Sequence, residues 1–213
     1  MKKSFLTIIC LVATFAATQV LASGDAAAGK NKVATCAGCH AGDGNSMVSA
    51  FPKLAGLGEK YLYRQLQNIK SGERVIVEMT GILDANSDQD LQDMAAYYDS
   101  QQRSIAGAQE ITMIGYSDPA EALELGEDLY RGGNIETGVP SCAGCHSPTG
   151  TGNGPAGYPG LGGQHADYIA SQLLKYQSGE RASGANAKIM QGVAERLSNK
   201  EIKAVANYIS GLN

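Results

Sequence analysis

Apolar residues recur at helical spacing near the end of each half of this 213-residue chain. Each stripe follows a helix-start signal: Ser198 and Glu201 form a capping-box pattern, and Ser87 and Asp90 form its shorter-armed analogue. Side chains three and four positions apart share one face of a helix. We therefore predict two closing helices with these buried stripes: Leu91, Met94, Ala95 and Tyr98, and then Ile202, Val205, Ala206 and Ile209.

Other segments also predict helices rather than strands. The stretches are residues 25–36 and 119–132, and residues 59–71 and 166–178, the last two ending beside Gly72 and Gly179. A glycine-rich loop covers residues 150–163, and no alternating strand pattern persists in the sequence. The predicted fold class is all-α.

A unit of about 90 residues occurs twice. Ser71-Gly-Glu-Arg74 matches Ser178-Gly-Glu-Arg181, and Pro52-Lys-Leu-Ala-Gly56 matches Pro159-Gly-Leu-Gly-Gly163. We predict a first domain over residues 23–105, a linker over 106–117 and a second domain over 118–213.

Residues 1–22 have the pattern of a secretory signal peptide. Lys2 and Lys3 precede an apolar run that ends at Val20-Leu21-Ala22, a small-residue cleavage pattern. The alternative is an uncleaved anchor, but Thr7, Thr14, Thr18 and Gln19 interrupt the run, which is short of the roughly 20 apolar residues of a membrane span. We expect cleavage and export, with Cys10 removed.

The composition indicates that each domain has too few large apolar side chains to form a full hydrophobic core by itself. Trp is absent, and Phe51 is the sole Phe beyond residue 22. A small domain with so few large apolar side chains has a thin core, which a bound macrocycle would complete. Without the signal, 15 basic residues face 21 acidic ones, a formal charge of −6. This balance argues against nucleic acid as a partner and suits a positively charged one.

The pentapeptide Cys-Ala-Gly-Cys-His occurs at Cys36–His40 and again at Cys142–His146. Cys-x-x-Cys-His is the attachment signal of c-type haem, in which two thiols bond the vinyl groups and the histidine binds iron. Covalent attachment is thus expected at Cys36, Cys39, Cys142 and Cys145, with His40 and His146 on the irons. Two haems c per chain follow.

Methionine is the best candidate for the sixth iron ligand. Only Met79 and Met190 are methionine in both copies of the repeat, each two residues before a glycine, and we expect both on loops. Met47 aligns with Asn153 and Met94 with Val205, while Met113 falls in the linker. His165 aligns with Gly58 and is expected near a helix start rather than on iron. A thioether suits low-spin iron.

With these residues the chain resembles the cytochrome c4 family, exported diheme proteins made of two class I cytochrome c domains. The resemblance rests on both Cys-Ala-Gly-Cys-His motifs, the Pro-x-Leu-x-Gly segments, the Ser-Gly-Glu-Arg turns and the loops of Met79 and Met190. It implies domains related by a pseudo-twofold axis, with close haem edges. By the same resemblance, Pro52 and Pro159 offer the carbonyls that hold the two histidines.

The family implies a periplasmic one-electron carrier in a respiratory chain, between an upstream quinol-oxidising complex and a terminal oxidase. We expect a monomer, with peripheral membrane association as an option. Arg74, Arg181, Tyr61 and Tyr168 are hypothetical partners of the haem propionates, since guanidinium groups pair well with carboxylates. The alternative for the arginines is a solvated turn.

Other functions remain open. A diheme peroxidase would need a five-coordinate iron and distal acid–base groups, and a dedicated haem subunit of an oxidoreductase complex would serve a single partner. A thioredoxin-type pair lacks its βαβ context. Zinc would need a fourth ligand that neither motif supplies.

Overall fold

The computed structural model describes residues 23–113, 115, 118–184 and 186–213. The predicted signal peptide over residues 1–22 lies outside these described residues. Within them, the chain forms helices and turns, and the sole β pairing is two isolated bridges, Asn134 with Val139 and Asn153 with Tyr158. The all-α fold class is confirmed.

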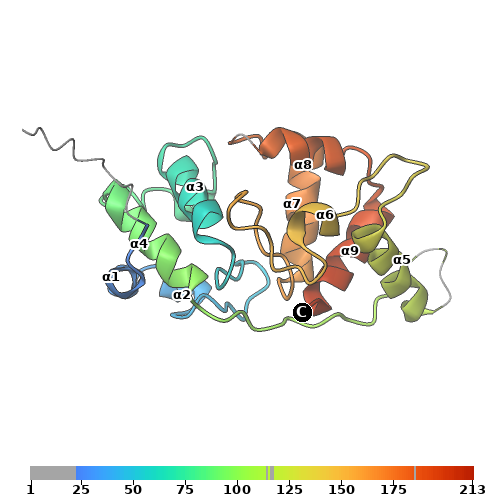
Figure 1. The fold of residues 1–213 in the computed structure, drawn as a ribbon, viewed down its shortest axis with the longest axis horizontal. Coiled ribbons are helices and arrows are strands. Elements are labelled where there is room, and N and C mark those ends of the chain that lie inside the picture. Colours follow the sequence, from blue (N-terminus) through green and yellow to red (C-terminus); the bar gives the residue numbers. More distant parts are fainter. Residues whose placement is uncertain (1–22, 114, 116–117, 185) are drawn as a thin grey trace, which may run out of the picture.

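Two helical halves lie side by side along the long axis of the molecule (Figure 1). We call residues 23–105 the first half and residues 118–213 the second half. The first contains α1 (Ala26–Lys30), α2 (Ala37–His40), α3 (Glu59–Lys70), the 3₁₀ turn η1 (Val77–Met79) and α4 (Asp88–Asp99). The second contains α5 (Pro119–Arg131), α6 (Ala143–His146), α7 (Ala166–Gln177), α8 (Ala187–Ala194) and α9 (Asn199–Gly211).

The two closing helices begin where the caps predicted. The Ser87 side chain accepts from the backbone N–H of Asp90, whose carboxylate reaches back to Ser87, and Ser198 and Glu201 repeat this arrangement at α9. Both predicted stripes are buried. They form the centres of two separate hydrophobic cores, one in each half.

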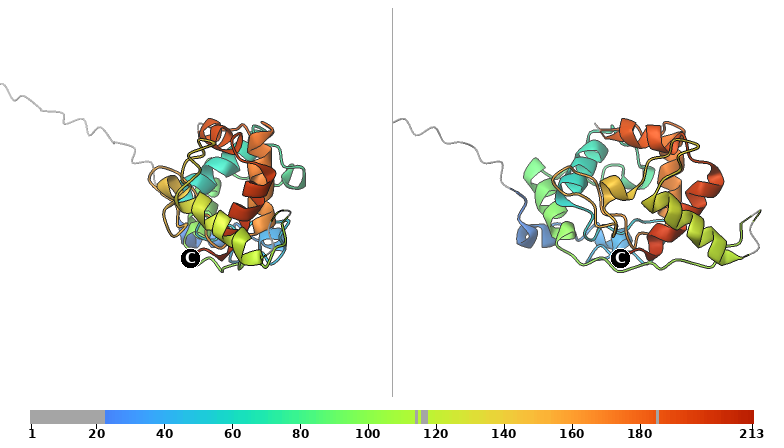
Figure 2. Two further views of the ribbon diagram at one scale, coloured as in Figure 1. Left: turned by 90° about the vertical axis from the view of Figure 1, so that its right-hand side faces the viewer. Right: turned by 45° about the vertical axis from the view of Figure 1, so that its right-hand side comes forward.

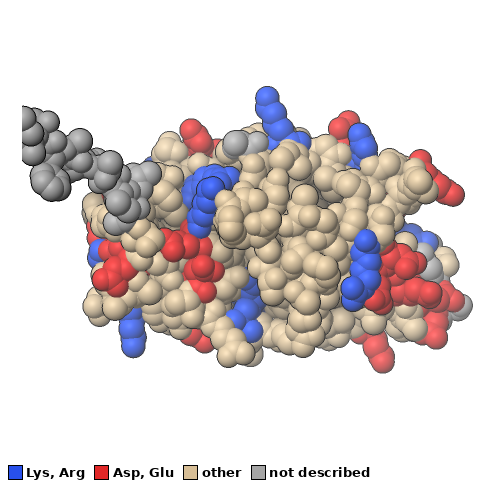
Figure 3. Space-filling model, in the orientation of Figure 1, with Lys and Arg blue, Asp and Glu red and all other residues tan. Residues whose placement is uncertain are grey.

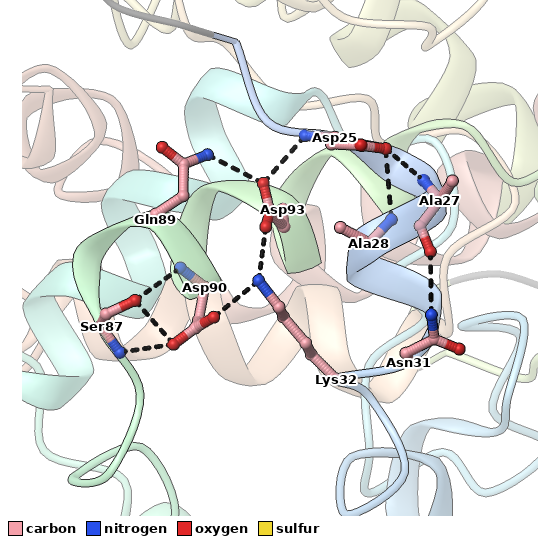
Figure 4. A network of polar contacts seen from close by, with 9 residues as sticks. All are labelled: Asp25, Ala27, Ala28, Asn31, Lys32, Ser87, Gln89, Asp90 and Asp93. Carbon is pink, nitrogen blue, oxygen red and sulfur yellow. Dashed lines mark hydrogen bonds and ion pairs between the residues drawn. The ribbon is translucent and has the colours of Figure 1, made fainter.

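Each core is closed by a pair of crossing helices, α1 with α4 and α5 with α9. Glycine permits the close approach: a Cβ on Gly29 would lie 2.0 Å from the Asp93 carbonyl oxygen, and one on Gly126 would lie 2.4 Å from that of Ala204. An ion network reinforces the first crossing. Lys32 lies 2.6 Å from Asp90 and 2.5 Å from Asp93 (Figure 4).

Two helix predictions need correction. Residues 25–36 do not form one helix, because α1 ends at Lys30 and turns lead to the separate α2. These turns allow Cys36 to pack against the hydrophobic core of the first half. Met190, expected on a loop, lies in α8. The second half has four more residues between Arg181 and Met190 than the first has between Arg74 and Met79, and this alanine-rich insertion provides enough helix-forming residues for α8.

Residues 106–113 run along the lower edge of the molecule in Figure 1 and pair with α9. Gly107 donates to the Ser210 carbonyl oxygen at 2.8 Å, and Gln109 exchanges two hydrogen bonds with the Asn207 side chain. The turned views of Figure 2 show the same course beneath both halves. Among the described residues, no helix is long and apolar enough to cross a bilayer.

Candidate functional site

Both Cys-Ala-Gly-Cys-His segments form a single short helical turn, α2 and α6. The following residue has a left-handed backbone in each case, with φ of 62° at Ala41 and 67° at Ser147. Such a conformation is costly for a residue with a Cβ and persists where the surroundings require it. Here it turns the chain sharply directly after each histidine.

Each histidine ring forms a hydrogen bond with a proline carbonyl oxygen. Nδ1 of His40 lies 2.9 Å from the Pro52 oxygen, and Nδ1 of His146 lies 2.8 Å from that of Pro159. A carbonyl only accepts, so Nδ1 carries the proton and Nε2 keeps the lone pair. Burial lowers the pKa of both histidines, and the carbonyl opposes this only in part. Each ring is therefore a neutral imidazole suited to a metal.

The four thiols sit in a half-buried to exposed position at the same turns. Burial raises the pKa of Cys36, and it raises that of Cys142 to about 11. Both thiols are protonated at neutral pH, and none of the four forms a disulfide. They remain available for thioether bonds.

One cavity of about 1200 Å³ contains all of these groups. It exceeds the roughly 300–1000 Å³ of a typical small-molecule pocket. Its walls carry both cysteine pairs, both histidines, Met79 and Met190, surrounded mainly by aliphatic and aromatic side chains. The cavity crosses from one half to the other. An apolar hollow with two thiol pairs, two imidazoles and two thioethers fits two covalent haems.

A polar cluster lies where the two halves meet. Arg181 donates to the hydroxyl oxygen of Tyr61 at 2.8 Å, and Arg74 donates to that of Tyr168 at 3.3 Å. Gln65 and Gln172 each accept from both arginines. The crossed pattern links α3 of the first half with α7 of the second. We call these six residues the interface cluster: Tyr61, Gln65, Arg74, Tyr168, Gln172 and Arg181.

The two arginines differ in their surroundings. Arg181 is 7% exposed and stacks on the Tyr176 ring, 4.6 Å from its centroid. Burial disfavours its charge, but Tyr61 and the neighbouring phenols outweigh this and raise the pKa of Arg181. Arg74 is only half-buried. The alternative of a solvated turn is therefore wrong for Arg181.

The structure also shows contacts between the two halves that sequence patterns missed. Gln164 and His165 of the second half reach into the first, with His165 Nε2 2.8 Å from the Ser46 carbonyl oxygen. Neither residue has its own type at the equivalent place of the first half, so the repeat gave no signal for them. Such contacts arise only when the halves meet.

Comparison with known proteins agrees with this geometry. The family model "Cytochrome c" matches residues 26–103 and 124–213. Cytochrome c4 of Stutzerimonas stutzeri is 49% identical over 216 residues, covering 97% of this chain and 98% of that protein.

A solved structure and a more distant relative agree with this family match. The crystal structure of reduced recombinant cytochrome c4 from Pseudomonas stutzeri superposes with a TM-score of 0.82, at 49% identity, over 89% of this chain and all of that one. A "Thiosulfate dehydrogenase electron acceptor" of Stutzerimonas stutzeri (strain A1501) is 36% identical, covering 83% of this chain and 78% of that protein. With two cytochrome c segments, two haem-attachment turns and these relatives, the chain belongs to the cytochrome c4 family of diheme cytochromes.

Proposed function

We propose that the protein is a periplasmic one-electron carrier of a respiratory chain. In this proposal Cys36, Cys39, His40 and Met79 hold the first haem, and the second is held by Cys142, Cys145, His146 and Met190. The observation that carries the proposal is the duplicated donor set, with each imidazole fixed by a proline carbonyl, along one shared cavity. Bound haem supplies reversible exchange of one electron between ferrous and ferric iron.

The chain's own residues shape that chemistry. Pro52 and Pro159 fix the tautomer and orientation of the two imidazoles. Met79 and Met190, which line the same cavity, would each supply the second protein ligand of one iron, so no iron position would remain for oxygen or peroxide. This arrangement favours an electron carrier over a peroxidase-type enzyme.

The interface cluster supports exchange between the two haems. Its arginines place two positive charges on the wall shared by both parts of the cavity. Guanidinium groups there would pair with haem propionates, with Tyr61 and Tyr168 as additional donors. The interface cluster would then hold propionates of both haems.

Location and partners complete the proposal. Residues 1–22 direct export and are removed, residues 23–105 and 118–213 form the two domains, and residues 106–117 link them. The proposed donor is a quinol-oxidising complex and the proposed acceptor a terminal oxidase, with a monomeric carrier that associates at most peripherally with the membrane.

Acidic side chains gather over α5 at one end of the molecule, where Glu121, Glu124, Glu127 and Asp128 lie (Figure 3). This acidic surface is complementary to a redox partner with a positively charged docking surface.

Methionine ligation is tested by removing each thioether in turn. Met79→Ala and Met190→Ala should each abolish about half of the weak long-wavelength absorption of Met-ligated ferric haem, and each should let one reduced haem bind carbon monoxide. Met47→Ala is the matched control, because Met47 is 88% exposed and does not line the cavity. Fast, stoichiometric binding of carbon monoxide by the unmodified protein would instead support the enzyme.

A second candidate is a dedicated electron acceptor of one oxidoreductase. It is favoured by the likeness to the thiosulfate dehydrogenase electron acceptor. Stopped-flow reduction of the holoprotein separates the two. Fast reduction by quinol-energised membranes supports the respiratory carrier, whereas fast reduction only by a thiosulfate-oxidising enzyme supports the dedicated acceptor.

A further inference from the structure

The peptide group between Pro52 and Lys53 connects His40 to the other half of the molecule. Its carbonyl oxygen accepts from Nδ1 of His40 at 2.9 Å. Its N–H, on Lys53, donates to Oε1 of Gln164 at 2.9 Å. A side chain of the second half is thus two hydrogen bonds from the ring proposed to bind the first iron.

Gln164 is fixed in this position. It is 2% exposed, and its Nε2 donates to the Lys53 carbonyl oxygen at 2.8 Å. Its Oε1 accepts a second bond, from the backbone N–H of His165, at 3.1 Å. The amide therefore pairs with both backbone groups of Lys53 and has a single orientation.

The next residue reaches the same loop of the first half. His165 Nε2 lies 2.8 Å from the Ser46 carbonyl oxygen, and the Ser46 hydroxyl donates to the Cys39 carbonyl oxygen at 3.0 Å. Two consecutive residues before α7 therefore contact the segments around both His40 and Cys39.

The second half has a weaker counterpart. The Pro159 carbonyl accepts from His146, and the N–H of the same peptide, on Gly160, donates to the Leu57 carbonyl oxygen at 3.2 Å. Leu57 is the repeat equivalent of Gln164. The same cross-half link thus exists twice, but one copy uses a buried side-chain amide and the other a longer bond to a backbone carbonyl.

Hydrogen bonds in a chain polarise one another. When Gln164 accepts from the Lys53 N–H, the Pro52 oxygen becomes a stronger acceptor and draws the Nδ1 proton of His40 more firmly. A more electron-rich imidazole stabilises ferric over ferrous iron. We propose that Gln164 is a positioning residue that lowers the reduction potential of the first haem from the opposite half of the chain.

This inference rests on ligation by His40 as proposed above. In the holoprotein, Gln164→Leu places at this site the residue that the first half carries at position 57. We expect the ferrous-to-ferric ratio of the first haem to rise two- to tenfold at the wild-type midpoint. Tenfold corresponds to a shift of about +59 mV for one electron. The second haem should keep its potential.

Potentials are assigned to each haem by following its methyl NMR signals during stepwise reduction. The hyperfine shift of the His40 Nδ1–H signal gives a readout that a purely structural role would not move. Leu91→Met is the control: it conserves volume at a buried position that does not line the cavity, so both potentials should stay unchanged. Gln164→Glu keeps an acceptor oxygen and adds charge, so the potential of the first haem should be lower than in the wild type and in Gln164→Leu.

Three results would overturn the inference: an unchanged first potential in Gln164→Leu, an equal shift of both haems, or a Gln164→Glu potential no lower than that of the wild type if Gln164→Leu does not fold. Haem content and the long-wavelength band of the wild-type protein are measured in parallel. Two Met-ligated haems with no selective shift refute the role of Gln164 alone. Fewer than two haems refute the proposed function itself.

Discussion

At the scale of single residues, Arg181 and Arg74 hold equivalent places in the repeat but different environments. Arg181 is buried and stacked on Tyr176, whereas Arg74 is half-buried and the repeat places Ile69 where Tyr176 would be. Hydrogen bonds from a charged group contribute about 1.5–3 kcal/mol when buried. Arg181→Gln should therefore lower the free energy of unfolding by about 2–4 kcal/mol, and Arg74→Gln by about 1 kcal/mol.

Denaturant unfolding of the two holoprotein variants, side by side, measures this difference. The same substitution at both positions makes each variant the control for the other. Equal losses would show that the environment of Arg181 adds nothing. Because both variants remove a positive charge from the cavity wall, both should also lower the haem potentials.

Residues differ in how far the sequence predicts their role. The repeat singled out Met79 and Met190, because a ligand needed twice must recur at the same place, and both lie on the cavity wall with the histidines. Gln164 was missed because its partner, Lys53, is 111 residues away and the repeat has leucine there. Local sequence patterns cannot predict a contact between the two halves when the equivalent position of the other repeat carries a different residue.

At the scale of elements, the two helix crossings depend on glycine. Alanine at Gly29 or Gly126 would place a Cβ inside contact distance of a backbone carbonyl, which cannot move without shifting α4 or α9. Overpacking of this kind costs about 1–3 kcal/mol or more. We expect Gly29→Ala to be the more destabilising, since its clash is closer.

Thermal unfolding of the holoprotein measures this. The control is Gly192→Ala in α8, where a Cβ would meet nothing within 4 Å. That change should stabilise by about 0.5–1 kcal/mol, because alanine loses less backbone freedom in a helix. A neutral Gly29→Ala would mean that α1 and α4 pack less closely than described.

The ion network at the first crossing gives a pH dependence. The hydrogen bond and charge of Lys32 lower the pKa of Asp90, and at Asp93 they help to outweigh the opposing effect of burial. A carboxyl with a lowered pKa stabilises the fold above its ordinary pKa of about 4. That stabilisation disappears as pH falls through the lower values of the folded state.

Lys32→Met should therefore shift acid unfolding of the first half to higher pH. The second half should not change, because Leu129 and Ala204 occupy the places of Lys32 and Asp93 there. NMR signals from each half during an acid titration would separate the two. Lys30→Met, which removes the same charge from an exposed site in α1, is the control.

Elements also differ in predictability. Capping boxes and apolar stripes predicted α4 and α9, because their start signals and buried faces are local in sequence. The predicted length of α1 was wrong, because the helical pattern of the sequence continues past Lys30. That pattern does not reveal that the chain must turn there to bring Cys36 and His40 to the cavity. The α8 helix was missed because the duplicated segment around Met79 suggested a loop and the insertion has no counterpart.

At the scale of the whole molecule, Arg103 joins the halves. It donates to the Ala55 carbonyl at 2.7 Å, to the Gly56 carbonyl, and to the Gly162 carbonyl of the second half at 2.9 Å. Burial lowers the pKa of Arg103 to about 10, so it remains charged at neutral pH. One guanidinium thus satisfies backbone oxygens of both halves, directly beside the loop that begins at Pro52.

Arg103→Met should uncouple the halves more than it unfolds either one. Each core has its own hydrophobic cluster, so loss of this bridge leaves both intact and removes a connection between them. Calorimetry of the holoprotein should change from a single cooperative transition toward two. Arg196→Met is the control, because Arg196 donates to the Gly138 carbonyl at 2.7 Å within the second half. If Arg103→Met leaves one transition of unchanged width, the halves are held instead by the interface cluster, the Gln164 link and the pairing of residues 106–113 with α9.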